Sequence, residues 1–139
     1  MIDDFINTLF RYRDIISLDY CHLLYVNLRD DLFNDCSGSD FVNLLNLKDT
    51  SHPITLKGDK RIYLVCLIDA LEEKVTFKDF AVEWRNRMLE IFDIDERYYK
   101  SHRKDFYNDN SARERHVKFR DKLLKSIEVA DSLKKRFNR

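Results

Sequence analysis

The sequence predicts an all-α fold, a single compact bundle-like domain of about six or seven helices. The first observation is the scarcity of chain breakers, since the two glycines and the one proline all lie between positions 38 and 58. Sheet-rich folds need turn residues at short, regular intervals, and this chain does not supply them. The second is the long stretches rich in Leu, Lys, Glu, Arg and Asp, which favour helix. A length of 139 residues with 44% hydrophobic residues fits one domain with a packed core.

The first fifty residues are expected to form an N-terminal helical portion of this domain (1–50). A long apolar-periodic stretch from Asp3 to Asn34 predicts helix, with a break expected near Asp14. The polar sequence NDCSGSD that follows predicts a loop. Ser39 or Asp40 is then expected to cap a short helix that carries Phe41, Leu44 and Leu45.

The sequence DTSHPITLKG, residues 49–58, is the one irregular stretch of the chain. Pro53 has no backbone N–H to donate, so a central strand is excluded here. Residues 53–57 are therefore expected to hold at most a short extended or edge segment around Ile54–Lys57, and its pairing partner is left open.

The remainder of the chain reads as four helices. Asp59 is expected to cap the first of them. Thr76 and Asp79, three residues apart, resemble a capping box for the second, with Asp in place of the usual Glu. The apolar stripe predicted for the inner face of this second helix is Phe77, Phe80, Ala81, Trp84, Met88 and Ile91.

The last two helices also have recognisable starts. Asp95 is expected to cap a helix that carries Tyr98, Tyr99, His102 and Phe106. Because adjacent helical residues point about 100° apart, one of the two tyrosines is expected to be buried and the other to lie near the surface. Ser111 and Glu114 form a capping box for the final helix.

The first two of these four helices are compatible with a helix-turn-helix. One runs from Asp59 to about Glu73 and the next begins near Phe77, so a short polar turn joins them. That turn lacks the glycine common in the motif. Short connections between helices occur in many folds, so the motif is an interpretation that the structure must decide.

The sequence predicts no catalytic centre, cofactor or metal site, and so a non-enzymatic protein. The three cysteines (Cys21, Cys36, Cys66) show no CxxC spacing, which argues against a disulfide framework and a structural zinc site. The histidines, which never pair four residues apart, are His22, His52, His102 and His116. Two glycines twenty residues apart cannot form a phosphate-binding or dinucleotide-binding loop, and no GxSxG or HExxH occurs.

No targeting or membrane-spanning signal is visible either. The N-terminal sequence MIDDFINTLF carries acidic residues where a signal peptide carries basic ones. No stretch approaches the 18 consecutive apolar residues of a transmembrane helix. The cytoplasm is the expected location.

Charge is divided unequally along the chain, although the formal net charge is zero. Residues 1–96 hold 11 basic and 19 acidic side chains, a net of −8, whereas residues 97–139 hold 14 and 6, a net of +8. Such a division bears on partners or on docking of one part of the chain against the other.

The basic C-terminal third is the candidate binding surface. On the predicted final helix, basic residues recur at spacings of 3, 4 and 3 and so form one row along a single face. Such a row is typical of contacts to nucleic-acid phosphates. The residues expected to make these contacts are Arg97, Lys100, Arg103, Arg113, Arg115, Lys118, Lys122 and Lys125. The alternative is a solvated face whose positive charges only balance the negative charge of residues 1–96.

Three stretches between about residues 53 and 127 resemble the C-terminal region of the RteC family of conjugative-transposon regulators. They are ITLKGDK followed by LVCLIDAL, then IFDID followed by YYK, and finally KFRDKL. The resemblance covers a little over half of the chain and makes residues 53–136 an RteC-like helical portion. It implies an all-helical protein whose C-terminal domain has a winged-helix-like DNA-binding element and acts in control of element excision and transfer.

Charge layout and resemblance together predict a DNA-binding or accessory regulatory protein of a mobile genetic element, with double-stranded DNA as its partner. A helical protein–protein interaction module, self-associating through its acidic and basic parts and without affinity for nucleic acid, is the alternative. The two differ in what the C-terminal cations face, which depends on the fold.

Overall fold

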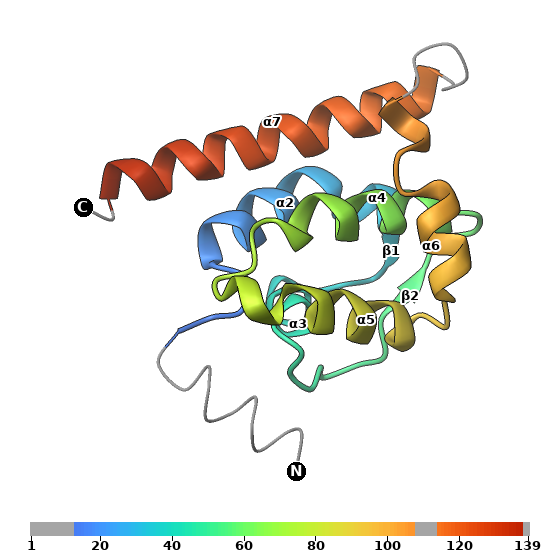
Figure 1. The fold of residues 1–139 in the computed structure, drawn as a ribbon, viewed down its shortest axis with the longest axis horizontal. Helices are drawn as coiled ribbons and strands as arrows, with labels where there is room; N and C mark the ends of the chain where they lie inside the picture. The colour runs from blue at the N-terminus through green and yellow to red at the C-terminus, as the bar shows by residue number, and fades with distance from the viewer. Residues whose placement is uncertain (1–12, 108–113, 138–139) are drawn as a thin grey trace.

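The computed structural model describes residues 13–107 and 114–137, and in this part of the chain it is almost entirely helical (Figure 1). Two single-turn 3-10 helices, η1 (Lys78–Phe80) and η2 (Asp105–Tyr107), accompany six α-helices. The α-helices are α2 (Leu18–Leu32), α3 (Gly38–Leu45), α4 (Arg61–Glu72), α5 (Ala81–Ile91), α6 (Glu96–His102) and α7 (Glu114–Phe137). The predicted all-α fold is confirmed.

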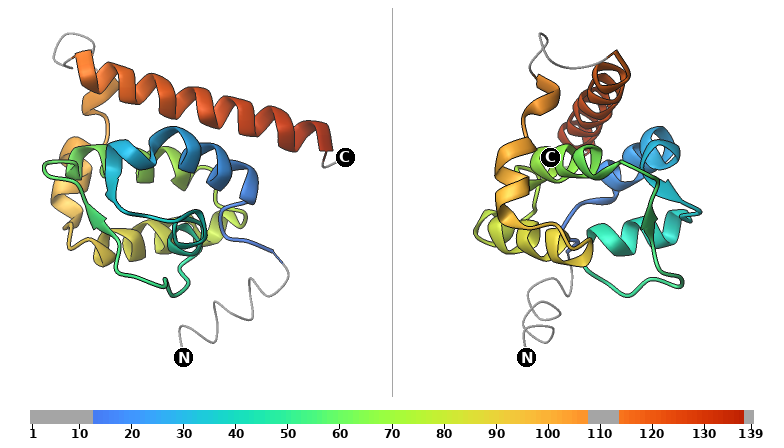
Figure 2. Two further views of the ribbon diagram at one scale, coloured as in Figure 1. Left: turned by 180° about the vertical axis from the view of Figure 1, so that it is seen from behind. Right: turned by 90° about the vertical axis from the view of Figure 1, so that its right-hand side faces the viewer.

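The helices form three layers (Figures 1 and 2). α2 and α4 make the middle layer, α3 and α5 lie on one side of it, and α7 lies across the other side. α6 closes one end of the molecule, next to the start of α7. The core lies between these layers and includes side chains from every α-helix.

The break expected near Asp14 is confirmed, because residues 13–17 are not helical. Ile15 and Ile16 are buried there, and their backbone N–H groups both donate to Oδ1 of Asn46, at 2.7 and 3.1 Å. The Asn46 amide nitrogen donates in turn to the carbonyl oxygens of Ile16 and Val42. One buried amide therefore replaces the backbone partners that a strand or helix would have given this segment.

The extended segment expected near residue 55 is also confirmed, and the structure supplies its partner. β2 (Thr55–Leu56) pairs antiparallel with β1 (Phe33–Asn34), which directly follows α2. The backbone N–H of Lys57 then donates to the carbonyl oxygen of Leu32, the last residue of α2. This two-residue ladder fixes the C-terminal end of α2 against the loop that leads into α4.

The cap predicted for α3 is wrong by two or three residues. Ser37 is the N-cap, and its hydroxyl oxygen accepts from the backbone N–H of Asp40 at 3.1 Å. The Asp40 carboxylate instead accepts from the backbone N–H of Ser51 at 2.8 Å, which lowers the pKa of that carboxyl group. Asp40 is therefore buried as an anchor for the following loop and caps nothing.

The caps predicted for α4 and α5 are wrong for a tertiary reason. α4 has Lys60 as N-cap with no side-chain hydrogen bond, so Asp59 does not cap it. The Thr76 hydroxyl donates to the carbonyl oxygen of Asp14 at 2.6 Å, and the Thr76 N–H donates to Ile15. Thr76 therefore binds the buried N-terminal segment, and η1 with α5 begins without a capping box.

The start of α6 is as predicted, because the Asp95 side chain accepts from the backbone N–H of Tyr98 at 2.7 Å. Tyr99 is buried and Tyr98 is half-buried, which confirms the division expected for this pair. The helix ends at His102, so Phe106 lies in η2 and not in α6. Residues 3–12 of the predicted opening helix and Ser111 of the predicted capping box lie outside the described residues.

The apolar stripe of α5 is confirmed at its centre, where Trp84 and Met88 are fully buried. The indole N–H of Trp84 donates to the carbonyl oxygen of Leu45 at 2.8 Å, which joins α5 to α3. Ile91 is 52% exposed, so the stripe does not extend to the last residue of the helix as predicted. Within the described residues, no helix is long and apolar enough to cross a membrane.

We expect Asn46→Ala to lower the free energy of unfolding by about 2–4 kcal/mol, because the buried N–H groups of Ile15 and Ile16 would lose their acceptor. Urea unfolding followed by circular dichroism measures this loss. Asn43→Ala, one turn earlier on α3, is the matched control. Equal unfolding midpoints for the two variants would contradict the role given to Asn46.

Candidate nucleic-acid interface

α7 packs antiparallel on α2, and this register decides where its charges lie. Its buried side chains are Phe119, Leu123, Ser126, Ile127 and Ala130. Lys122 pairs with Asp31 near one end of α2, and Asn27 donates to the Ser126 hydroxyl at 2.8 Å in the middle. At the other end, the Tyr20 hydroxyl donates to the Asp131 carboxylate, which also binds Lys74 at 3.1 Å.

The predicted row on α7 exists as an exposed stripe. Successive helical residues are rotated by about 100°, so Arg115, Lys118, Lys122 and Lys125 fall within about 80° of one another. All four side chains are exposed. The stripe points about 100° away from the buried face, so it runs along the flank of α7 beside α2.

The structure divides these cations by what they bind. Within the described residues, Arg115 and Lys125 have no ion-pair partner. Lys118 lies 3.6 Å from Glu114 on its own helix, with both side chains mostly exposed. Lys122 pairs with Asp31, which is 91 residues away in the chain. The row is therefore only partly neutralised, and its one neutralising contact from another element comes from α2.

The stripe is narrow. On its outer side α7 presents exposed carboxylates at Glu114, Asp121 and Glu128. A surface one cation wide suits a single line of phosphates better than a broad interface filling a groove. From Arg115 to Lys125 the stripe extends about 15 Å along the helix axis.

The basic residues predicted on the helix that became α6 have different surroundings and do not form one exposed surface. Arg97 is exposed and has no ion-pair partner within the described part of the chain. Lys100 lies 3.1 Å from Glu96 at the surface. Arg103 lies 3.3 Å from Asp69, which is only 7% exposed and also binds Lys104 at 2.7 Å. Arg103 is thus part of a structural contact between α4 and the end of α6.

Arg113, the remaining predicted contact, lies outside the described residues. The sequence did not identify Asp31 or Asp69 as partners of basic residues. Both contacts join residues more than 30 positions apart. No local spacing could have signalled them.

The α4–α5 pair offers little positive charge to a nucleic acid. Eight residues, 73–80, separate the two helices and include η1, so the connection is longer than the short turn expected. On α5, Arg85 binds Glu72 at 3.2 Å and Arg87 binds Glu83 at 3.0 Å. The exposed side of α5 also carries Glu90. The basic side chains of α5 are therefore both engaged by carboxylates, unlike Arg115 and Lys125 of α7.

The thiols of the chain are poorly suited to nucleophilic chemistry. Burial raises the pKa of Cys21 and of Cys66 to about 12, and burial raises the pKa of Cys36 to about 11. Each remains a neutral thiol near pH 7, whereas the thiolate is the reactive form. Within the described residues, no group of three or more His, Cys, Asp or Glu side chains is arranged to hold a metal ion.

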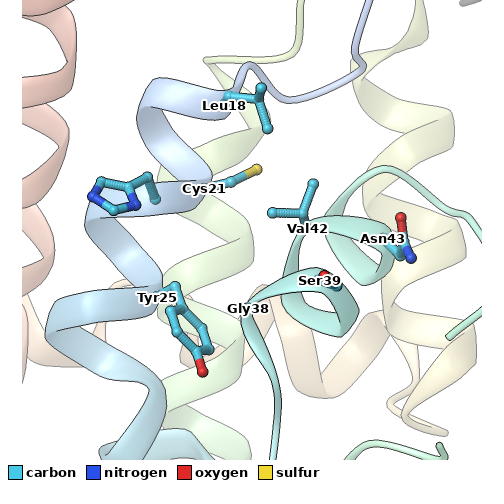
Figure 3. A pocket seen from close by; sticks show the side chains of 8 residues that line it. Leu18, Cys21, Tyr25, Gly38, Ser39, Val42 and Asn43 are labelled. Carbon is cyan, nitrogen blue, oxygen red and sulfur yellow. The ribbon is translucent and has the colours of Figure 1, made fainter. Parts of the chain in front are cut away.

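Between α2 and α3 the surface has an open groove of about 630 Å³ (Figure 3). Leu18, Cys21 and Tyr25 of α2 lie across it from Val42 of α3. The lining is mainly apolar, it includes His22 beside Cys21, and none of the residues that line it is a carboxylate.

No protein family, curated protein or solved structure gives a match to this chain. The resemblance to the RteC family therefore stays a prediction, and the stripe on α7 is interpreted from its own geometry.

The contact at Asp69 predicts different roles for two arginines of the C-terminal third. We expect Arg103→Gln to lower the free energy of unfolding by about 1 kcal/mol, because it removes a charged hydrogen bond to a buried carboxylate. We expect Arg97→Gln to change it by less than about 0.5 kcal/mol. Thermal and urea unfolding measure both variants, and a loss at Arg97 equal to that at Arg103 would overturn this assignment.

Proposed function

We propose that this protein binds double-stranded DNA non-enzymatically, through the phosphate backbone, along the flank of α7. The observation that carries the proposal is the exposed stripe of Arg115, Lys118, Lys122 and Lys125 on one rigid helix. A straight helix holds such side chains at fixed spacing, so several phosphates can be neutralised at once. Arg97 is an additional exposed cation on α6.

The length of the stripe sets the scale of the contact. A DNA strand presents one phosphate per about 3.4 Å of helix axis, so about 15 Å of α7 can follow about four phosphates. Contacts of this kind position a protein on DNA without reading its sequence. We therefore expect strongly salt-dependent binding with little sequence preference from this face alone.

Duplex is favoured over single-stranded nucleic acid because residues 114–136 present no exposed aromatic ring beside the stripe. Proteins that hold single strands combine cations with exposed aromatic rings on which the bases stack. Along residues 114–136, the aromatic rings are Phe119, which is buried, and His116, which stacks on Phe106 at 4.4 Å. Neither ring is presented beside the stripe for a base.

The biological setting of the proposal rests on the resemblance in residues 53–127. If the protein acts as RteC-like regulators do, its DNA contact serves transcriptional or accessory control within a mobile genetic element. We propose this role as the narrower form of the function, and α7 as the element through which it contacts DNA.

A protein interaction module is the second candidate, and two exposed side chains on α2 favour it. Leu18 is 57% exposed and Val26 is 59% exposed. With the division of charge along the chain, a second copy is the fitting partner. Light scattering at low and high salt tests this function, which requires an oligomer that dissociates in salt.

We expect the double variant Lys118→Gln/Lys125→Gln to weaken duplex binding roughly tenfold or more in dilute salt, and to reduce the slope of log affinity against log salt by roughly 1.8. The physical reason is that two fewer counterions are released from the DNA. Fluorescence anisotropy with a labelled duplex, at several salt concentrations, measures both quantities.

The control is Lys48→Gln/Lys78→Gln, which removes the same charge from exposed positions far from α7 in the sequence. Its salt slope should equal that of the unmodified protein. Absence of duplex binding at low salt, or equal weakening by both double variants, would remove the basis for a DNA contact on α7.

A further inference from the structure

Asp31 lies in the last turn of α2 and reaches the middle of the cationic stripe. Its carboxylate pairs with the ammonium group of Lys122, and the two side chains are 35% and 46% exposed. The contact is therefore accessible from solvent. It is also the stripe's one ion pair with a different helix among the described residues.

A second cation of the stripe acts on the same tyrosine as Asp31. The pKa of the Tyr63 hydroxyl is raised mainly by burial, and among nearby charges Arg115 lowers it while Asp31 raises it. Arg115 and Lys122 are two helical turns apart on one face of α7, and Asp31 contacts the stripe at Lys122.

The surrounding contacts hold this carboxylate in place. The Ser126 hydroxyl donates to the carbonyl oxygen of Lys122 at 2.7 Å and accepts from the Asn27 amide at 2.8 Å. Asn27 is one turn before Asp31 on α2. These bonds keep the two helices in register, so the backbone positions of Asp31 and Lys122 are fixed relative to each other.

We propose that Asp31 occupies, within the folded chain, the place that a DNA phosphate takes at Lys122, and so limits the affinity of the stripe for DNA. This inference rests on the proposed function. A phosphate oxygen and a carboxylate oxygen accept the same charge-assisted hydrogen bond from an ammonium group. DNA must therefore displace Asp31 or leave Lys122 unused.

The acidic residues nearest to Asp31 and to the stripe do not contact the stripe from a different helix. The Asp30 side chain is 90% exposed and lies 3.7 Å from Arg29 of its own helix. Glu114 approaches Lys118 from one turn away on α7, and its side chain is 87% exposed. Both are mostly exposed and pair with a residue of their own helix, whereas Asp31 is carried by a different helix packed against the stripe.

The test compares Asp31→Asn with Asp30→Asn, which changes the net charge equally at the adjacent position. We expect Asp31→Asn to bind a labelled duplex about tenfold more tightly at about 50 mM salt, and to steepen the salt slope by roughly 0.9, the value for one additional phosphate contact. Asp30→Asn should give a smaller gain and an unchanged slope.

Lys122→Gln completes the comparison. In the unmodified protein it should weaken binding, because it leaves the Asp31 carboxylate unpaired beside the stripe, whereas in the Asp31→Asn background it should abolish the gain. Unfolding midpoints of all variants verify that the packing of α7 is retained.

The outcomes separate the two proposals. If neither the unmodified protein nor Asp31→Asn binds duplex DNA at low salt, the proposed function fails and the inference fails with it. If the protein binds DNA but Asp31→Asn gains no more than Asp30→Asn, only the role of Asp31 is overturned.

Discussion

The fold depends on the buried amide of Asn46. Ile15 and Ile16 are buried in a segment, residues 13–17, that is neither helix nor strand, and an unpaired buried polar group costs free energy comparable to a lost hydrogen bond. Asn46 satisfies this segment from the end of α3, Thr76 satisfies it from the α4–α5 connection, and the Trp84 indole binds the neighbouring carbonyl of Leu45. The end of α3 and the α4–α5 connection are thereby held to residues 13–17, and α5 is held to the end of α3.

α7 packs on the outside of these helices. Its register on α2 decides which of its basic residues lie next to acidic residues from earlier in the chain. The acidic residues of the first part of the chain (1–96) do not neutralise the basic C-terminal third as a whole. Asp31 meets Lys122, Asp69 meets Arg103 and Lys104, and other cations remain in solvent. The balance between a binding surface and a self-neutralised one is set by individual contacts, since screened charges farther apart contribute little.

Local signals in the sequence were reliable where the decisive partner was also local. Asp95 caps α6 because its acceptor bond runs to a backbone N–H three residues away. Thr76 has the same local pattern, but its hydroxyl donates to the carbonyl oxygen of Asp14, 62 residues earlier, and therefore does not cap α5. Ile91 fits the periodicity of α5 yet is 52% exposed at the last residue of the helix, and the core continues instead through Ile94.

The sequence by itself determined the helical class, the approximate helix positions, the extended segment near residue 55 and the row of cations on the last helix, because each follows from composition or from periodicity along one element. Only the tertiary structure decided which cations are engaged and by which acids, and that Arg103 belongs to a structural contact while Arg115 and Lys125 do not. The reason is that ion pairing depends on distances between elements, and the packing of α7 on α2 and α4 fixes those distances.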